Sequence, residues 1–433
     1  MCPNLPQANG LIGQASYTLG AANTGGTSGS TLSAPLGALS QEGAIWYLAD
    51  SANNRILGYS SAAPTGITGA ASFIIGQPNA QSTAGGTGPV SGSPIGFSNP
   101  AKASVGTVGG TSYLVVADSG NNRVLIWNRL PTTNTAPNVV LDQPDFSSSD
   151  ANHPTATVSA SSLSDPTAAV IGSKGQLIVV DQGNNRVLVW NAVPTINNAL
   201  ANVELGQAAI NPAGVVTCTT NAGVSGACFA NSAQGVDTYN AAAQSYVLAM
   251  RLPTDAWTDG TRLLVSDTGN NRVLFWAAVP NVNDKLPDNL IGAGQFGTFS
   301  PAGGAGAQGL SGPRSVASDD VDVFVGDTRN NRVLEYAGYL NAPANSPSAR
   351  YVFGQSDFTH IAPNDPDQNS IAGDQRTNPA TDGITAGTMD APTGVFATSS
   401  NDLFVTDSGN NRVLHFAISS GVDGSENYIP CSP

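Results

Sequence analysis

The chain lacks any hydrophobic run long enough to cross a membrane. No stretch of about 18 apolar residues occurs, which excludes a spanning helix. The N-terminus, MCPNLPQANG, has no charged segment followed by an apolar one, as an uncleaved export signal would have. Charge is scarce too, at 11% of the residues with a net charge of −14, and Lys occurs only as Lys102, Lys174 and Lys285. Without a basic stripe, neither nucleic acid nor an anionic membrane surface is an expected partner.

Cysteine is equally sparse, and its placement is informative. Cys2 and Cys431 lie at the two ends of the chain, Cys218 and Cys228 lie close together, and no zinc-type CxxC spacing occurs. This pattern favours the disulfides Cys2–Cys431 and Cys218–Cys228 over a metal cluster, and therefore an exported protein that is secreted, cell-surface or periplasmic. Four reduced thiols, or an acylated Cys2 in a lipoprotein, are the alternatives. No Asn begins an N-x-Ser/Thr site, which favours a bacterial origin.

What the chain does have is one phrase in six near-copies, of which ADSGNNRVLIW is typical. Successive copies begin 60 to 86 residues apart. A β-rich run precedes each Asp and another follows each Arg, which predicts two strands joined by a tight turn. The Asp and Arg then face each other at the base of the turn as a structural ion pair. The six pairs are Asp50/Arg55, Asp118/Arg123, Asp181/Arg186, Asp267/Arg272, Asp327/Arg332 and Asp407/Arg412.

The turn residues indicate which position takes a left-handed conformation. The Gly of the phrase is replaced by Ala52 in the first copy and by Arg329 in the fifth, whereas both Asn recur in all six copies. Because Asn tolerates positive φ better than Ala or Arg, we expect an Asn in that conformation.

Two further strands complete each repeat. A Pro-led stretch precedes each hairpin, and a strand ending in Gln follows each of the first five; we name the four strands a, b, c and d. The sixth Gln-bearing strand is the one at the N-terminus, over residues 10–14, which must therefore pair into the last blade at residues 391–417. The prediction is an all-β, six-bladed β-propeller of four-stranded blades, a single domain over residues 1–433, with the ring closed by the N-terminal strand.

The DSGNNRVL phrase in this strand context resembles the NHL-repeat family of β-propellers. The resemblance covers essentially the whole chain and implies the same six blades of four strands. Some NHL-repeat enzymes, the peptide-amidating lyases, hold zinc with three histidines around the channel. The three histidines of this chain are His153 and His360, in loops, and His415, in a strand c. Their positions do not reproduce such a ring, so no metal site is predicted.

The connections between strands differ in how much their lengths vary. From the Gln of strand d to the Pro of the next strand a the spacing runs from 18 to 46 residues, whereas from the aromatic residue of strand c to the next Gln it is only 16 to 19. The b–c and d–a connections share one face of a propeller, so this face, the d–a face, is the expected binding surface. Its second longest loop carries Phe358 and His360 as candidate contacts.

Strand a lines the channel of a propeller and supplies the other candidates. Counting alternate residues from the Pro places Lys102, Asp255 and Trp257 inward as small-molecule contacts. In the second longest loop, the run Asp365-x-Asp367-x-Asn369 alternates oxygen ligands, but Ser370 and Arg376 stand where an EF-hand needs Gly and Glu. A looser calcium site and a solvated acidic loop are the alternatives there; no other cofactor is expected.

The sequence leaves three functions open. The preferred one is an exported binding propeller that presents its d–a loops to a protein, peptide or glycan, and so is not an enzyme. The second is a metal-dependent lyase or lactonase acting at the channel mouth. The third is a structural subunit that self-assembles into a surface layer or filament. Fold alone does not choose among them, because propellers support many unrelated functions.

Overall fold

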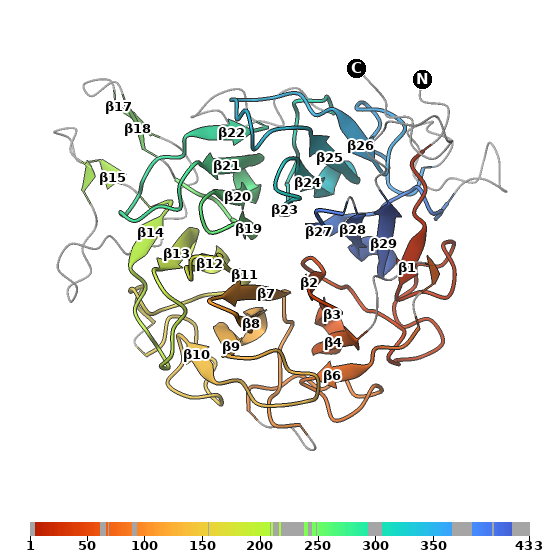
Figure 1. Cartoon of the computed structure of the whole chain (residues 1–433), viewed down its shortest axis with the longest axis horizontal. Coiled ribbons are helices and arrows are strands. Elements are labelled where there is room, and N and C mark those ends of the chain that lie inside the picture. The colour runs from red at the N-terminus through yellow and green to blue at the C-terminus, as the bar shows by residue number, and fades with distance from the viewer. Residues whose placement is uncertain are drawn as a thin grey trace.

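The computed structural model shows a ring of six antiparallel blades around a central axis (Figure 1). It describes residues 5–60, 66–67, 69–88, 93–154, 156–207, 209–210, 216–217, 238–240, 245–247, 249–292, 305–365, 383–400 and 402–417. In these residues the helices are six 3-10 turns of three residues each, one per hairpin. No helix in the described part of the chain is long and apolar enough to span a membrane.

The first three blades follow one another along the chain, with strand a nearest the axis and strand d outermost. Each is a four-stranded sheet. Their strands are, for blade 1, β2 (Ser40–Glu42), β3 (Ile45–Asp50), β4 (Arg55–Ser60) and β6 (Phe73–Ile75); for blade 2, β7 (Lys102–Val108), β8 (Thr111–Asp118), β9 (Arg123–Trp127) and β10 (Val139–Leu141); for blade 3, β11 (Pro166–Ile171), β12 (Leu177–Asp181), β13 (Arg186–Trp190) and β14 (Val203–Leu205).

The last three blades repeat this pattern. Blades 4 and 5 contain β19 (Asp255–Thr258), β20 (Leu263–Asp267), β21 (Arg272–Trp276), β22 (Asn289–Ile291), β23 (Ser315–Ser318), β24 (Val323–Asp327), β25 (Arg332–Tyr336) and β26 (Tyr351–Phe353); blade 6 contains β27 (Pro392–Ala397), β28 (Asp402–Asp407), β29 (Arg412–Ala417) and β1 (Gly10–Ile12). The loop between blades 3 and 4 adds two short hairpins, β15 (Ala209–Ile210) with β16 (Val216–Thr217) and β17 (Thr238–Asn240) with β18 (Ser245–Val247).

The ring closes where the N-terminal strand joins the last blade. Strand β1 pairs antiparallel with β29, with Gly10 opposite His415 and Ile12 opposite Val413. In Figure 1 the red β1 accordingly lies beside the blue β29. The predicted fold class, an all-β six-bladed propeller closed by its first strand, is confirmed.

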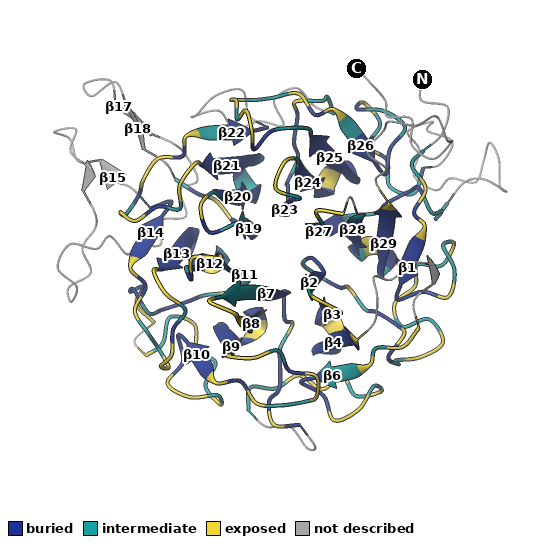
Figure 2. Ribbon diagram, viewed as in Figure 1, coloured by how far each residue is buried: buried dark blue, intermediate teal, exposed yellow. Residues whose placement is uncertain are grey.

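The core of the molecule is divided among the contacts between neighbouring blades. Each of six apolar clusters joins two adjacent blades, and Figure 2 shows the strands buried and the exposed residues gathered in the loops. At the closure, Ile12 and Val413 of blade 6 pack with Trp46 and Leu48 of blade 1. Burying one such apolar side chain stabilises a fold by about 1.5–3 kcal/mol, so this cluster contributes directly to holding the ring closed.

The c–d loops also cross from one blade to the next. In blade 3, Asn197 Oδ1 accepts the N–H of Val140 in β10 at 3.1 Å, and the Asn198 N–H donates to the Val140 carbonyl at 2.9 Å. We call these contacts edge clasps, because they satisfy backbone groups on the outermost strand of the neighbouring blade. Equivalent bonds join Asn134 to Gly76, Asn283 to Glu204 and Asn345 to Leu290.

Between blades 6 and 1 a short strand takes the place of the clasp. Strand β5 (Gly66–Ile67), which follows strand c of blade 1, pairs in parallel with β1, with Gly10 opposite Gly66. The c–d connection therefore covers a neighbouring edge at this point of the ring as well.

Candidate functional site

The repeated phrase forms a buried polar centre in every blade. In blade 2, the Asp118 carboxylate accepts hydrogen bonds from Arg123 Nε at 2.7 Å and Asn121 Nδ2 at 2.8 Å. All six Asp–Arg pairs form this ion pair at 2.6–2.8 Å, with side chains at most 2% exposed. Burial raises the pKa of Asp118, and the positive charge of Arg123 offsets part of that rise.

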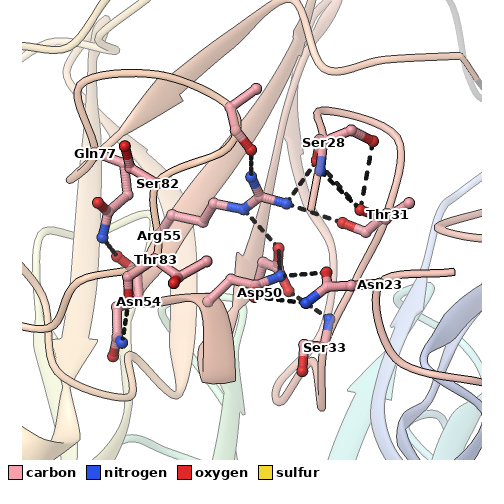
Figure 3. A network of polar contacts seen from close by, with 12 residues as sticks. Asn23, Ser28, Thr31, Ser33, Asp50, Asn54, Arg55, Gln77, Ser82 and Thr83 are labelled. Atoms are coloured by element: carbon pink, nitrogen blue, oxygen red, sulfur yellow. Dashed lines mark hydrogen bonds and ion pairs between the residues drawn. The ribbon is translucent and has the colours of Figure 1, made fainter. Parts of the chain in front are cut away.

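Each Arg of the phrase also fixes the loops of the d–a face. Figure 3 shows this in blade 1, where Arg55 reaches from Asp50 towards Ser28 and Thr31. Its Nη2 donates to the Ser28 and Thr31 carbonyls at 2.7 and 2.9 Å, in the loop that enters the blade. Its Nη1 donates to the Ala80 carbonyl at 2.6 Å, in the loop that leaves it. The six guanidinium groups are buried, with side chains at most 2% exposed, and are therefore inaccessible to a ligand.

The Gln that ends strand d also fixes a loop of the d–a face. Gln77 Nε2 donates to the Asn54 carbonyl at 2.9 Å and to the Ala84 carbonyl at 2.8 Å, which ties the hairpin to the outgoing loop. Gln14, Gln143 and Gln355 make equivalent pairs of bonds. Together, Arg and Gln hold the two ends of a d–a loop while its middle is unconstrained by them.

The second Asn of the phrase joins each blade to the next. As the sequence indicates, this Asn takes the left-handed conformation in every copy, with φ of 51–55°. Its Oδ1 accepts the N–H of the residue before the next Pro, as Asn54 does from Asn99 at 2.8 Å. The acceptors and donors in the other blades are Asn122 with Asp165, Asn185 with Leu252, Asn271 with Gly312, Asn331 with Ala391 and Asn411 with Ala34.

The segments held in this way surround a cavity of about 90 Å³ near the axis at the d–a end of the ring. All six blades contribute to it. Its walls are formed by Leu36, Gly37, Asn99, Ala101, Lys102, Ser119, Asp165, Thr167, Gln182, Thr254, Asp255, Arg314 and Thr393. Most of them are the residues directly before and after the Pro that opens strand a, so the inter-blade bonds of the Asn residues position the cavity walls.

The cavity brings together two of the sequence candidates. Lys102 Nζ of blade 2 lies 2.5 Å from Asp255 Oδ1 of blade 4, and both side chains are less than a tenth exposed. Burial raises the pKa of Asp255, and the ammonium of Lys102 offsets part of the rise. The two residues neutralise each other across the axis; that they contact a ligand stays a prediction.

Two further charged residues of the cavity are absent from the sequence candidates. Asp165 lies on the blade 3 wall and Arg314 on the blade 5 wall. Counting alternate residues forward from the Pro misses them, because Asp165 comes directly before Pro166 and Arg314 directly after Pro313. In blades 3 and 6 the register shifts after the Pro, between Pro166 and Ala168 and between Pro392 and Gly394, and a bulge there brings the residue next to the Pro to the axis as well. The detectable signal is the set of six residues that follow Pro: Leu36, Ala101, Thr167, Thr254, Arg314 and Thr393.

The remaining binding candidates lie away from the cavity walls. Trp257 packs against the apolar cluster between blades 4 and 5, with the Arg262 guanidinium 5.9 Å from its ring centre. Phe358 is 8% exposed and belongs to the same cluster, while its carbonyl accepts a hydrogen bond from Arg332. The structure therefore does not bring these two residues together with Lys102 and Asp255.

His360 is held by the loop that carries it. Its Nδ1 lies 2.8 Å from Asp357 Oδ1. Burial raises the pKa of Asp357, but hydrogen bonds from Thr359 and His360 outweigh it and bring that pKa to about 2. His415, in β29, stacks on Phe404 at 4.4 Å and pairs with Asp402 at 2.6 Å.

Several sequence candidates lie outside the described residues. These are the four cysteines and, in the acidic run, Asp367 and Asn369. Neither predicted disulfide is therefore tested. Of the acidic run only Asp365 is described, and its side chain is buried. Among the described residues, no group of three or more His, Cys, Asp or Glu is arranged to hold a metal ion.

A family model for the NHL repeat matches residues 390–416, which contain the sixth copy of the phrase. This match and the six-bladed ring confirm the resemblance to NHL-repeat propellers. A search of curated protein sequences finds no match. Among solved structures, hydrazine synthase of Kuenenia stuttgartiensis is 10% identical, with a TM-score of 0.42 over 90% of this chain and 96% of that one. Virginiamycin B lyase from Staphylococcus aureus is 8% identical, with a TM-score of 0.40 over 90% and 97%. Similarities this low carry no argument about function.

Proposed function

We propose that this protein is a binding propeller that holds a polypeptide partner on its d–a face. The observation that carries the proposal is that the loops on that face differ in length while the same hydrogen bonds fix their ends in each blade. The Arg, Gln and Asn of each repeat fix the loop ends through the same hydrogen bonds, as Arg55, Gln77 and Asn54 do in blade 1. A rigid frame lowers the entropy lost when the loops bind a partner.

Charge favours a polypeptide over a glycan. The cavity on this face carries both signs of charge, from Lys102, Arg314, Asp165 and Asp255, and peptides offer groups of both signs whereas neutral sugars do not. Sugar rings bind well on exposed aromatic faces. Of the five tryptophans, Trp46, Trp127, Trp190 and Trp276 are buried, and Trp257 is half-buried with the Arg262 guanidinium near its ring.

Selection from a displayed random-peptide library, followed by mapping of the bound face, tests this function. Gln81→Trp with Ser147→Trp alters exposed positions in the d–a loops, and Lys174→Trp with Ser400→Trp alters exposed positions in a–b turns as the matched control. We expect the first pair to weaken a selected peptide at least tenfold and the second pair less than threefold. Binders that respond only to the a–b pair, or a library that yields no binders while a glycan array does, would contradict the proposal.

The other two functions make different predictions. A metal-dependent lyase or lactonase requires bound metal, so metal analysis of the purified protein and a melting curve with chelator address it directly. A layer or filament subunit assembles when pure, so size-exclusion chromatography over a range of concentrations addresses that function. Stoichiometric zinc or calcium, or ordered assembly, would favour one of these functions over partner binding.

Export belongs to the proposal and rests on the cysteines. Two disulfides, Cys2–Cys431 and Cys218–Cys228, suit an oxidising compartment of a bacterium. Intact mass under non-reducing conditions distinguishes disulfides from free thiols, which alkylation would tag, and from an acyl group on Cys2, which would add its own mass.

A further inference from the structure

The cavity on the d–a face contains two charges that have no counter-charge in contact. Within the described residues, the Arg314 guanidinium makes no hydrogen bond and no ion pair, and Asp165 has no cation within ion-pair distance. Lys102 cannot supply that partner, because Asp255 already holds it at 2.5 Å. Arg314 and Asp165 line the same cavity from different blades without touching.

The surroundings of these two charges shift the pKa of both groups, although Asp165 also accepts a hydrogen bond from Ser119. Burial lowers the pKa of Arg314, and the nearby charge of Asp165 opposes that shift. Asp165 is exposed at the rim, yet the cavity walls crowd its carboxyl, and burial raises its pKa, with Arg314 acting against the rise. The two groups therefore influence each other across the cavity, and a ligand placed between them would reach both.

The charge balance of the cavity restricts the ligand. Two positive and two negative side chains leave the walls with no net charge. A simple anion would gain from Arg314 but would be repelled by Asp165, and a simple cation would face the opposite situation. A molecule with one charge of each sign gains at both positions, and its carboxylate matches the forked donors of an Arg side chain.

We propose that the cavity binds a zwitterion of amino-acid size, with its carboxylate at Arg314 and its ammonium at Asp165. The volume of about 90 Å³ corresponds to roughly six to nine water molecules, which suits so small a ligand. Thr167 Oγ1, also on the wall, has no hydrogen-bond partner among the described residues and supplies a further polar contact. This site does not depend on the polypeptide partner proposed above.

Isothermal titration of the full chain with a series of ω-amino acids tests the site. Glycine, β-alanine, γ-aminobutyrate and 5-aminovalerate differ only in the distance between their charges, while acetate and methylammonium each carry one of them. We expect one member of the series to bind at least tenfold more tightly than either single-charge ion. No saturable binding in the series, or equal binding of acetate, would overturn the proposal.

Two variants locate the binding. Arg314→Gln should weaken the best ligand at least tenfold without lowering the melting temperature, because its guanidinium has no partner to lose. The matched control is Arg129→Gln, an exposed Arg after strand c of blade 2 that does not line the cavity; it should change affinity less than threefold. Equal effects of the two variants would place the ligand elsewhere, whereas a failure to bind peptides would leave this site unaffected.

Discussion

The two faces of the ring anchor their loops in opposite ways. On the d–a face, side chains from the blades hold the ends of the loops, as Arg55 holds the Ser28 carbonyl in the loop that enters blade 1 and the Ala80 carbonyl in the loop that leaves it. On the other face the c–d loop is itself the contact, since Asn197 and Asn198 in its middle bond to Val140 of the next blade. The first arrangement permits d–a spacings from 18 to 46 residues, and the second restricts c–d spacings to 16–19. Loop-length variation thus reports which part of a loop is bonded to the blades.

The largest effect should follow from removing a buried Asp of the phrase. Asp118→Ala leaves the buried Arg123 without its counter-charge, and we expect a loss of about 3–5 kcal/mol in the free energy of unfolding. Guanidinium denaturation measures it. The double variant Asp118→Leu, Arg123→Met removes both charges and should lose clearly less than the sum of the single changes. A single-variant loss below about 1 kcal/mol would mean that the d–a frame does not depend on this pair.

A smaller loss is expected from lengthening a c–d loop. Gly-Ser-Gly inserted between Thr195 and Ile196 shifts Asn197 and Asn198 away from Val140 and breaks two hydrogen bonds. At about 1 kcal/mol for each bond, the free energy of unfolding should fall by about 2 kcal/mol. Denaturation measures the loss, and protease digestion reports whether the blade 2 edge at β10 opens. An unchanged stability would show that the clasp does not limit loop length.

On the face with the edge clasps, a buried carboxyl should make the free energy of unfolding depend on pH. Glu335 in β25 is buried, and burial, with Asp322 and Asp319 nearby, raises its pKa to about 8. Because the folded pKa lies above the unfolded value of about 4.3, the folded chain binds more protons between these values, and this contribution to stability is lost as the pH rises from about 4 to 8.

Glu335→Gln removes this dependence. The variant should match the wild type near pH 4, and at pH 8.5 it should exceed the wild type by at least about 1 kcal/mol in the free energy of unfolding. Chemical denaturation at the two pH values gives the difference. A variant that is less stable than the wild type at both pH values would contradict the assignment.

The smallest effect is expected for an insertion in a d–a loop. The same Gly-Ser-Gly placed between Gly25 and Gly26 breaks one hydrogen bond, from the Gly26 N–H to the Asn23 carbonyl at 2.7 Å. A side chain at either position would meet no atom within 4 Å, so the added residues have space. Lengthening a loop costs little entropy, so the fall in free energy of unfolding should stay at or below the value of that one bond, about 1 kcal/mol. This insertion is the matched control for the one in the c–d loop, and an equal loss from both would remove the contrast between the two faces.

The repeated parts of the fold could be read from the sequence because local chemistry dictates them. Opposite charges at the ends of paired strands bring Asp118 and Arg123 together. The recurrence of Asn where Gly varies predicts a left-handed Asn in the turn, and the structure shows that it is the second one, Asn122. The strand count places the first strand in the last blade. None of these inferences needs information about how the blades pack.

The residues that line the cavity could not be predicted from the sequence in the same way. Arg314 lines it from the position directly after Pro313, one place before the inward position that strict alternation selects. The residues before each Pro, such as Ala34 and Leu252, take positive φ although neither residue type favours it. The hydrogen bonds from Asn411 and Asn185 of the preceding blades hold them there, so the backbone depends on a neighbour that the local sequence does not reveal.

Closure by β1 has a consequence for the order in which the chain is made. A ribosome releases residues 10–12 long before residues 412–417, with which they pair. Throughout that interval the first strand has only the two-residue strand β5 to pair with, and blade 1 lacks the neighbour that packs against Trp46. The nascent chain can assemble blades 1 to 5 as an open arc, but it can complete the circle only near the end of translation.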